Sequence, residues 1–543
     1  MFDIIIRGGQ IIDGTGRDRY RADVGVTGDA VTGIGDLSGA EANETIDASD
    51  LIVAPGFIDT HSHADVVAWA SPAYDSKVLQ GVTTEHIGLC GISLAPCSDQ
   101  YMDLLQRYID AITGEEDIEW NWRSFSELLD VIDEKSMPIN LLPSVGHGTV
   151  RTAVMGFEDR PPSAEELEQM KDLVREAMEA GAFALTSGLV YPPGSYSDGE
   201  EMRQLCRVVS EFGGMYSTHM RSESHQLLES VEESIRAAEG SGVTLLLSHF
   251  KAMGQSNWGK VEEALALVDR ARGRGVRVWL DQYPYTANST LLSALIPPWA
   301  HAGGVPALLE RLNDPAERSR IIETIETVDD GSWENFVLDA GGWDGALVAW
   351  VPEDPSVENV TLADLARKLG KTPGDALADL LVDNRASGMV ITLTMCDEDV
   401  RTVMRHPAQV VGSDALPHRG KPHPRSYGTF PRVLGKYCRE EGVFTLEEAV
   451  RKMTGQSAEI LGLKDRGILA RGKRADITVF DPRTVRDGAT YEEPQRKPAG
   501  IPWVLVNGKC VVRDGQFTNE SAGRLIRRPE QPTRGGGEGD YRR

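Results

Sequence analysis

The sequence contains few cysteines and no long hydrophobic run. No stretch approaches the roughly eighteen consecutive apolar residues from which a membrane-spanning helix is recognised. The N-terminal stretch MFDIIIRGGQIIDG lacks the basic start, the long apolar segment and the small-residue cleavage site of a signal peptide. The six cysteines are scattered along 543 residues: Cys90, Cys97, Cys206, Cys396, Cys438 and Cys510. This spacing is too sparse for a disulfide framework and favours a reducing compartment, so we expect a cytoplasmic protein.

Positive charge is also scarce. The chain has 56 Lys and Arg against 83 Asp and Glu, which gives a formal net charge of -27. Such a surface repels nucleic acids and anionic membranes and favours solubility, so neither is expected as a partner. Acidity by itself names no substrate, and we expect a small molecule. The oligomeric state cannot be read from the composition.

The middle of the chain alternates short apolar runs with helical stretches. Residues 163–181 and 231–242 have the pattern of amphipathic helices. The apolar runs fall at eight places: 56–61, 83–89, 139–146, 182–188, 215–219, 243–249, 277–281 and 409–414. Strands that alternate with helices indicate parallel βα units. Eight such units predict an α/β fold of the (β/α)8, or TIM, barrel type.

The two ends of the chain have a different sequence pattern from the middle. Residues 1–55 and 466–543 contain short β pieces punctuated by Gly and Asp, which is typical of antiparallel sheets. We expect these two segments to form one small β-sandwich domain, followed by a Gly- and Arg-rich mobile tail. The barrel would then occupy 56–465. The long stretch between the last two predicted strands predicts an inserted subdomain at about 300–390.

Residues with metal-binding chemistry stand where predicted strands end. His61 and His63 follow the first strand in GFIDTHSH, and the other candidates are Cys90, His219, His249 and Asp414. The strand ends of a barrel converge on one face, where catalytic residues lie. Imidazoles, a thiolate and a carboxylate suit zinc better than magnesium or calcium. A metal-bound water and a nearby carboxylate, Asp414, would then supply a nucleophile and a general base.

Each of these residues also has a plainer interpretation. A single strand-end histidine is most often only hydrogen-bonded, and a buried cysteine such as Cys90 is usually a small hydrophobe. Cys97 is interpreted as structural. His86 is expected to pack or to support a ligand. For His147, in a Gly-flanked loop, an ordering role and a catalytic role stay open.

Several stretches resemble one known family. GFIDTHSH resembles the first-strand signature of the amidohydrolase superfamily. GVTTEHIGLCGISLAP, SGLVYPPGSY, STHMRSES, LSHFKAMG, DQYPYTANSTLLSALIPPW and PHPRSYGTFPRVLGKY are similar to its D-aminoacylase branch, the N-acyl-D-amino-acid deacylases. The resemblance covers about residues 2 to 526. It implies a metal-dependent barrel with a β-sandwich built from both chain ends.

The resemblance also implies a site. His61, His63 and Asp414 would hold one metal position, and Cys90, His219 and His249 the other. The position that includes the cysteine is the tightly filled one in this branch, and the second is often weak or empty. Further candidates, for substrate binding, are Lys251, Tyr191, Tyr283 and Arg221. For Arg221 a salt bridge is the alternative. The chain departs from the branch pattern at Leu89 and Ala415, where Asn and Gly are common, which leaves the fine specificity open.

The predicted activity is therefore zinc-dependent hydrolysis of the amide bond of N-acyl-D-amino acids, which are linear amides. A cyclic amidase of the hydantoinase or dihydroorotase kind shares the first-strand signature, but Cys90 stands where a carboxylated lysine is expected. A metal-free barrel that serves as a binding scaffold is the second alternative.

Overall fold

The centre of the molecule consists of parallel strands. The computed structural model describes residues 1–543 except 72–73, 114–117, 417–419 and 530–543. One sheet has the order β10-β9-β8, with strands β8 (Phe57–Asp59), β9 (Val82–Ile87) and β10 (Asn140–Pro143). A second sheet has the order β11-β12-β13-β14-β15-β19, and its strands are β11 (Val145–Gly146), β12 (Ala184–Gly188), β13 (Met215–His219), β14 (Thr244–Leu247), β15 (Val278–Gln282) and β19 (Gln409–Val411). Each of the eight predicted apolar runs therefore contains a strand.

The two sheets adjoin at both of their edges. On one side β10 continues into β11 after a single residue, Ser144. On the other side the segment after β8 meets the segment after β19, because Ser62 and Ala415 form a parallel bridge and Thr60 N donates to Val411 O at 3.5 Å. The carboxyl ends of the first and the last strand thus lie side by side.

Amphipathic helices connect and cover these strands. Helix α5 (Ala164–Ala180) shows why they form where they do. It begins at a capping box made by Ser163 and Glu166, ends at Gly181 with φ +112°, and buries the apolar stripe Met170, Val174, Ala177 and Met178. The other helices of this kind include α3 (Phe125–Asp133), α4 (His147–Met155), α6 (Gly199–Glu211), α7 (Leu227–Ser241), α8 (Val261–Gly273) and α14 (Asp397–Arg405).

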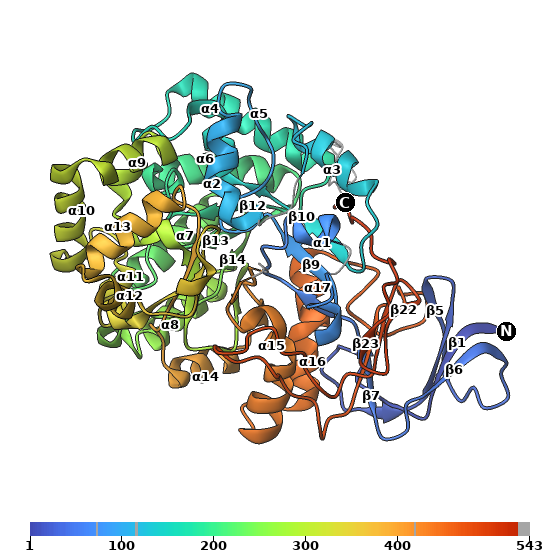
Figure 1. Ribbon diagram of the computed structural model, residues 1–543. Coiled ribbons are helices and arrows are strands. Elements are labelled where there is room, and N and C mark those ends of the chain that lie inside the picture. Colours follow the sequence, from blue (N-terminus) through green and yellow to red (C-terminus); the bar gives the residue numbers. More distant parts are fainter. Residues whose placement is uncertain (72–73, 114–117, 417–419, 530–543) are drawn as a thin grey trace, which may run out of the picture.

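Between β15 and β19 the chain builds a separate unit with its own hydrophobic cluster. Its antiparallel sheet has the order β16-β18-β17, with β16 (Asn288–Leu291), β17 (Ala346–Trp350) and β18 (Met389–Thr392). Its helices are α9 (Gly304–Asn313), α10 (Pro315–Thr327), α11 (Phe336–Asp339), α12 (Leu362–Leu369) and α13 (Pro373–Asp383). In Figure 1 this unit lies on the side of the molecule opposite the terminal sheets.

The chain ends pair with each other. A four-stranded sheet has the order β5-β4-β1-β6, with β1 (Phe2–Arg7), β4 (Asp23–Thr27), β5 (Ala30–Gly35) and β6 (Ala42–Asp47). A seven-stranded sheet has the order β23-β22-β21-β20-β7-β2-β3, with β2 (Gln10–Ile11), β3 (Tyr20–Arg21), β7 (Ile52–Pro55), β20 (Ile477–Phe480), β21 (Trp503–Val506), β22 (Lys509–Arg513) and β23 (Gln516–Phe517). The antiparallel pair β7–β20 joins the N-terminal strands to the C-terminal ones. Both sheets contribute side chains to one buried cluster, among them Ile6, Val24, Val479 and Leu505.

The remaining predictions on the ends of the chain concern the tail and the membrane. The predicted mobile tail falls, from residue 530 onward, outside the described residues. Among the helices in the described part of the chain, none combines the length and the hydropathy that crossing a bilayer requires.

Candidate metal centre and adjoining pocket

The predicted metal ligands meet at the carboxyl ends of the parallel strands. One ligand atom each from His61, Cys90, His249 and Asp414 lie within 4.8 Å of one another, and all four side chains are buried. The Cys90 sulfur is 3.3 Å from His61 Nε2 and 3.5 Å from His249 Nε2. His61 and His63 come after the end of β8 rather than within it, yet both Nε2 atoms reach Asp414 Oδ1, at 3.5 and 3.4 Å.

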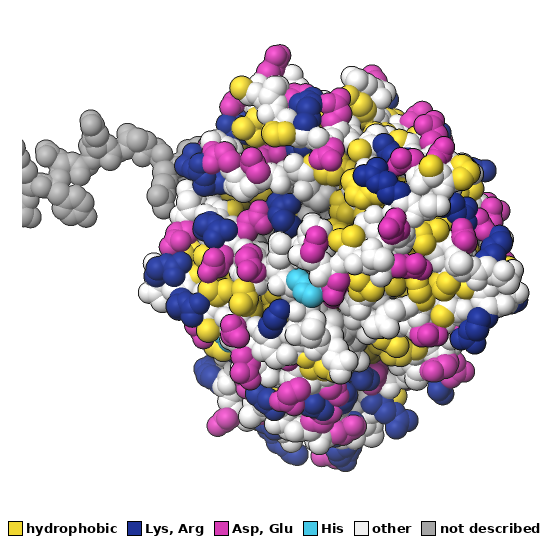
Figure 2. All heavy atoms as spheres, turned by 90° about the vertical axis from the view of Figure 1, so that its left-hand side faces the viewer, with side chains coloured by type: hydrophobic (Ala, Val, Ile, Leu, Met, Phe, Trp, Pro, Cys, Tyr) yellow, Lys and Arg dark blue, Asp and Glu magenta, His cyan; other side chains and the backbone are white. Residues whose placement is uncertain are grey.

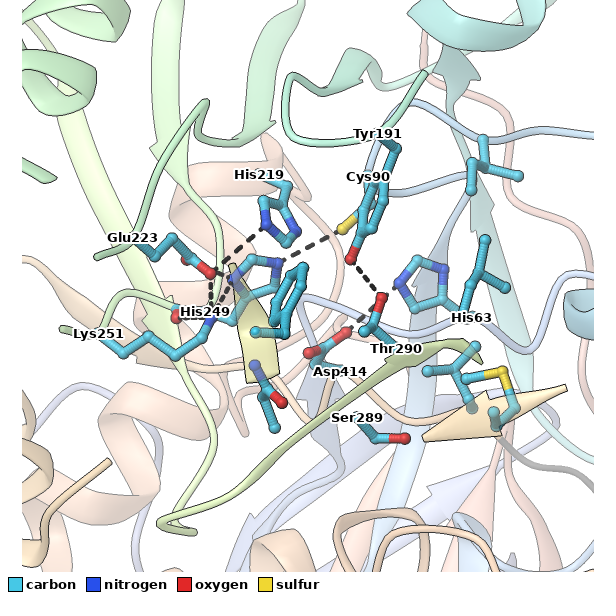
Figure 3. A pocket seen from close by; sticks show the side chains of 16 residues that line it. His63, Cys90, Tyr191, His219, Glu223, His249, Lys251, Ser289, Thr290 and Asp414 are labelled. Carbon is cyan, nitrogen blue, oxygen red and sulfur yellow. Dashed lines mark hydrogen bonds and ion pairs between the residues drawn. The ribbon is translucent and has the colours of Figure 1, made fainter. Parts of the chain in front are cut away.

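His219 completes this group from the end of β13. Its ring centroid lies 4.3 Å from that of His249, and Glu223, His219 and His249 also bring ligand atoms within 4.8 Å of one another. The structure thus gathers all six predicted ligands, with Glu223 added. In Figure 3, Glu223, His249 and Lys251 lie on one side, His63 lies on the other, and Asp414 is between them.

Three of these residues have a backbone conformation that L side chains rarely adopt. Cys90, His249 and Asp414 have φ values of +51°, +34° and +50°. Each follows closely on the end of a parallel strand. Positive φ at a non-glycine residue costs free energy and persists where the surroundings hold it, which is frequent at functional sites. Here the turn directs each side chain into the shared centre.

The electrostatics of the cluster favour the forms that bind cations. Burial alone would raise the pKa of the Cys90 thiol, but His61, together with His219 and His249, outweighs it and holds that pKa well below its usual range. Burial opposes ionisation of Asp414 too, and Arg425 with the neighbouring histidines keeps its pKa well below the ordinary value. Cys90 and Asp414 are therefore held in their anionic forms, thiolate and carboxylate, which are the forms that bind a metal ion.

Buried carboxylates behind the imidazoles fix their orientation. Asp281, at the end of β15, has its Oδ2 3.2 Å from His61 Nδ1, while its Oδ1 accepts from His249 N at 2.7 Å. Glu223 Oε1 lies 2.8 Å from His249 Nδ1. Carboxylates of this kind hold a ligand ring in one tautomer and one rotation. Sequence reasoning missed both residues, although Asp281 ends a predicted strand just as Asp414 does.

A pocket adjoins the centre. Its sixteen lining residues include His63, Cys90, His219, Glu223, His249 and Asp414. Lys251 and Tyr191, two of the predicted substrate-binding residues, line it as well. Tyr191 OH is 2.7 Å from Thr290 Oγ1. Lys251 forms an ion pair with Glu223, and its Nζ is 2.9 Å from His249 Nδ1.

Tyr283 lies behind this wall between two cations. Lys251 Nζ is 5.8 Å from its ring centroid and the Arg425 guanidinium is 4.6 Å from it. Burial, only partly offset by these cations, raises the pKa of the Tyr283 phenol to about 12, so it keeps its proton. Its buried OH makes no hydrogen bond within the described residues. A donor is thus available beside two positive charges.

Arg425 is a further residue that sequence reasoning missed. It is fully buried, its Nη1 is 2.8 Å from Asp414 Oδ2, and its Nη2 donates to Ser289 O at 3.0 Å. Its Nε atom has no hydrogen-bond partner in the part of the chain that the structure describes. The stretch PHPRSYG contains it, but nothing in its spacing distinguished it from a surface arginine.

Other predicted residues lie away from the centre. Arg221 is not among the pocket-lining residues: it pairs with Glu233 at 3.0 Å and donates to the carbonyls of Ser195 and Ser197. His86 bonds Thr60 O and Ser144 Oγ, behind the segment that carries His61. His147 is held by Glu201 at 2.7 Å.

The fold and this centre together define a class: an α/β protein that gathers imidazoles, a thiolate and carboxylates at strand ends is built as a metal-dependent hydrolase. The family model described as the amidohydrolase family matches residues 44–512, and the chain belongs to that family. A D-aminoacylase from Alcaligenes xylosoxydans xylosoxydans is 38% identical over 97% of this chain and 98% of its own length. An N-acyl-D-glutamate deacylase from the same organism is 36% identical over 97% of this chain and 96% of its own.

Solved structures agree with these relatives. The N-acyl-D-glutamate deacylase from Bordetella bronchiseptica, complexed with zinc and a phosphonate mimic of the tetrahedral intermediate, superposes with a TM-score of 0.83. It is 35% identical and covers 97% of this chain and 99% of its own. A D-aminoacylase structure described for its binuclear metal centre, with one-metal activation and second-metal attenuation, gives a TM-score of 0.82 at 36% identity, covering 97% of this chain and 100% of its own.

Proposed function

We propose that this protein hydrolyses the amide bond of N-acyl-D-amino acids and releases a D-amino acid and a carboxylate. One observation carries the proposal: the ligand atoms of His61, Cys90, His249 and Asp414 converge beside a pocket that contains Lys251. The relatives named for this reaction match over nearly the whole chain, so the comparison includes the site as well as the fold.

The donor set suits zinc. Cysteine thiolate, imidazole and carboxylate are its usual ligands in proteins. His219 Nε2 is buried and lies 3.5 Å from Glu223 Oε2, but it makes no hydrogen bond to any described residue. A buried ring nitrogen without a hydrogen-bond partner is free to coordinate a metal. We assign Cys90, His219 and His249 to one tightly held zinc, and His61, His63 and Asp414 to a second, weaker position. Bound there, zinc supplies Lewis acidity toward the amide carbonyl and lowers the pKa of a coordinated water.

Asp414 serves as the general base and then as the general acid. Its carboxylate faces the centre, and Arg425 at 2.8 Å keeps it ionised. In this proposal it takes a proton from the attacking water and passes it to the leaving amine nitrogen. The same carboxylate contacts both His61 and His63, which holds it at the centre.

The α-carboxylate of the substrate binds at the Tyr283 end of the pocket. Lys251 and Arg425 approach the same ring, and the Tyr283 OH is left as a hydrogen-bond donor. With the acyl carbonyl at the centre and the carboxylate at this end, only one enantiomer places its side chain in the open pocket. Tyr191 shapes the wall beside His219, its ring centroid 4.9 Å from that imidazole. For Arg221 we favour the salt-bridge role, because Glu233 engages its guanidinium.

We also propose the finer architecture. The parallel strands, with β10 and β11 counted as one, would close as a (β/α)8 barrel at 56–465, with the insertion at about 300–390 lying over its mouth. The terminal segments 1–55 and 466–543 would form a β-sandwich. The adjoining sheet edges and the shared cluster of the terminal sheets support both parts.

The expected partner is a small molecule in the cytoplasm. On the face shown in Figure 2, Lys and Arg side chains are interspersed with Asp and Glu. With a net charge of -27, this surface offers no attraction to nucleic acid or to an anionic membrane. The free state of all six cysteines fits a reducing compartment.

A substrate panel tests the proposal. The purified protein, loaded with zinc, is assayed with paired D- and L-N-acetyl amino acids and with hydantoins and dihydropyrimidines. We expect hydrolysis of the D series with a preference of at least about a hundredfold over the L series, as a three-point attachment implies. Turnover of the cyclic amides alone would favour the cyclic-amidase alternative. Absence of bound zinc together with absence of turnover would favour a scaffold.

A further inference from the structure

In the pocket next to the metal centre, the charged side chains already have charged partners within the protein. Among its described lining residues, Lys251 is the one lysine or arginine, and the acidic ones are Glu223 and Asp414. Glu223 pairs with Lys251 and lies against His249, while Asp414 pairs with Arg425. No cation is therefore left over for a second anionic group of a substrate.

The two cations that are present serve one position. Lys251 and Arg425 both contact the ring of Tyr283, at 5.8 and 4.6 Å from its centroid. Lys251 lines the pocket, and Arg425 lies on the Tyr283 ring outside the lining residues, so the positive charge gathers at this one end. An N-acyl amino acid has one α-carboxylate, and in the proposed function that group binds at this end of the pocket.

The rest of the wall is apolar or uncharged. Ile92, Leu291, Phe336, Met389 and Leu416 supply its hydrophobic side chains. They come from the loop after β9, from the inserted unit and from the segment after β19. Burying substrate methylene groups against such a wall is favourable, at about 0.8 kcal/mol for each one.

A second pocket continues this wall. It shares Tyr191, Leu291 and Phe336 with the first pocket and adds Val190, Ile296 and Trp333. Its one acidic lining residue within the described chain is Glu334, whose carboxylate accepts the hydrogen bond of Glu223 N. A carboxylate entering here would lose its hydration, find no cation and approach another carboxyl group.

On the basis of the proposed function, we infer that the protein selects N-acyl-D-amino acids with uncharged, apolar side chains and rejects the acidic ones, N-acyl-D-glutamate and N-acyl-D-aspartate. Overall identity does not decide this point, because the relatives named D-aminoacylase and N-acyl-D-glutamate deacylase are 38% and 36% identical. The lining of the pocket decides it. An anionic side chain that must be buried without a partner is strongly disfavoured.

The test compares kcat/KM of the zinc-loaded wild type for five substrates: the N-acetyl derivatives of D-leucine, D-methionine, D-glutamine, D-glutamate and D-aspartate. We expect D-leucine and D-methionine to exceed D-glutamate and D-aspartate by roughly a hundredfold or more. D-glutamine has nearly the size of D-glutamate without its charge and is expected to fall between the two groups. D-glutamate at or above D-leucine overturns the inference and leaves the proposed function intact. No turnover of any D substrate overturns the proposed function itself.

A matched pair of variants locates the selectivity. Leu291→Arg places a cation where the two pockets meet, and it is expected to raise the ratio of D-glutamate to D-leucine turnover at least about tenfold. Leu291→Met keeps an apolar side chain and is expected to preserve the wild-type ranking. If Leu291→Arg folds with normal zinc and leaves the ratio unchanged, this wall does not contact the substrate side chain and the inference fails. If it does not fold, the wild-type panel decides alone.

Discussion

At the residue scale, the centre depends on a cysteine with an unusual backbone. Cys90 has φ +51° and its sulfur lies between His61 and His249. We predict that Cys90→Ala loses the tightly bound zinc and nearly all turnover, because two imidazoles alone hold the metal poorly. Metal analysis after dialysis measures the loss. Cys97→Ala is the control, since Cys97 is buried, its thiol donates to Leu94 O, and it is not among the residues that line the pocket. Normal zinc and activity in Cys90→Ala would refute the ligand assignment.

The role of Asp414 can be separated from metal binding. Asp414→Asn keeps the shape of the side chain but removes its basicity. General acid–base groups contribute about 10²–10⁴-fold to rate, so we expect kcat to fall at least about a hundredfold while the zinc held by Cys90 is retained. A variant within tenfold of the wild type would mean that another group moves the proton.

Lys251 is the third residue whose role can be isolated. It pairs with Glu223 inside the pocket, and that pairing must be shared with the α-carboxylate of a substrate. We predict that Lys251→Met raises KM sharply for N-acetyl-D-amino acids and much less for their carboxamides, because only the acids have a charge to lose. Equal effects on acids and carboxamides would show that Lys251 does not recognise the carboxylate. Lys260→Met provides a control on a half-buried lysine outside the pocket lining.

At the scale of elements, the seam between the first and the last parallel strand has candidate ligands on both sides, His61 and His63 after β8 and Asp414 after β19. Asp59, the last residue of β8, accepts from Ser413 N at 2.8 Å and from His61 N at 3.2 Å. Lys77, which is fully buried, bonds both the Asp59 carboxylate and Ser413 Oγ. Asp414 N donates to His61 O at 2.8 Å. This network holds the segment of His61 in register with that of Asp414.

We predict that Lys77→Met destabilises the protein by about 3–5 kcal/mol, because it leaves the buried Asp59 carboxylate without its cation. Glu85, whose Oε1 is 3.4 Å from Lys77 Nζ, loses the same partner. Zinc should also leave faster on dialysis, since the two ligand segments lose their register. Thermal unfolding and metal retention measure the two effects. Lys497→Met, which removes an exposed pair with Asp75, should change stability by less than about 1 kcal/mol. A similarly small effect of Lys77→Met would show that the seam does not depend on it.

The elements show how far the sequence alone can lead. Eight apolar runs predicted where the central parallel strands lie, because a buried parallel strand has a continuous hydrophobic pattern. Five of these runs end in His or Asp, and that position indicated the candidate ligands His61, His219, His249 and Asp414. Lys77 could not be predicted in the same way. It lies in a connection between elements, and only the folded chain brings it to Asp59 and Ser413. Glu223 is similar: it follows His219 by four residues outside any periodic segment.

The insertion illustrates a second limit. Its sheet begins at Asn288, earlier than the predicted start at about 300, and β16 pairs with β18 a hundred residues later. The sequence of that region, ANSTLLSAL, contains no pattern that distinguishes strand from loop. Pairing with a distant partner determines its conformation. Six of the pocket-lining residues come from this unit, among them Leu291, Phe336 and Met389, so the specificity could not be predicted from the sequence.

At the scale of the whole molecule, a buried polar network joins the terminal sheets to the central strands. Asn140 of β10 donates to Thr83 O at 2.9 Å, and its Oδ1 accepts from Asn507 Nδ2 at 2.7 Å and from Arg524 N at 3.2 Å. Asp476 accepts from Asn507 N at 2.7 Å and pairs with Arg466. Residues far apart in the sequence therefore meet on the side of β10 away from the metal centre.

This network gives the last prediction. Asn140→Ala removes the acceptor of Arg524 N and one of the two acceptors of Asn507 Nδ2, the other being Ala522 O. A buried N–H left without a partner costs about 1–3 kcal/mol. We therefore expect a loss of about 2–4 kcal/mol in stability, seen as a lower melting temperature, whereas zinc content and kcat stay near those of the wild type. Asn313→Ala, at an exposed position where the side chain bonds only Leu309 O among the described contacts, is the control and should change little. If Asn140→Ala loses zinc in proportion to its stability, the terminal sheets support the metal centre directly. If it melts like the wild type, the network does not couple the two parts of the molecule.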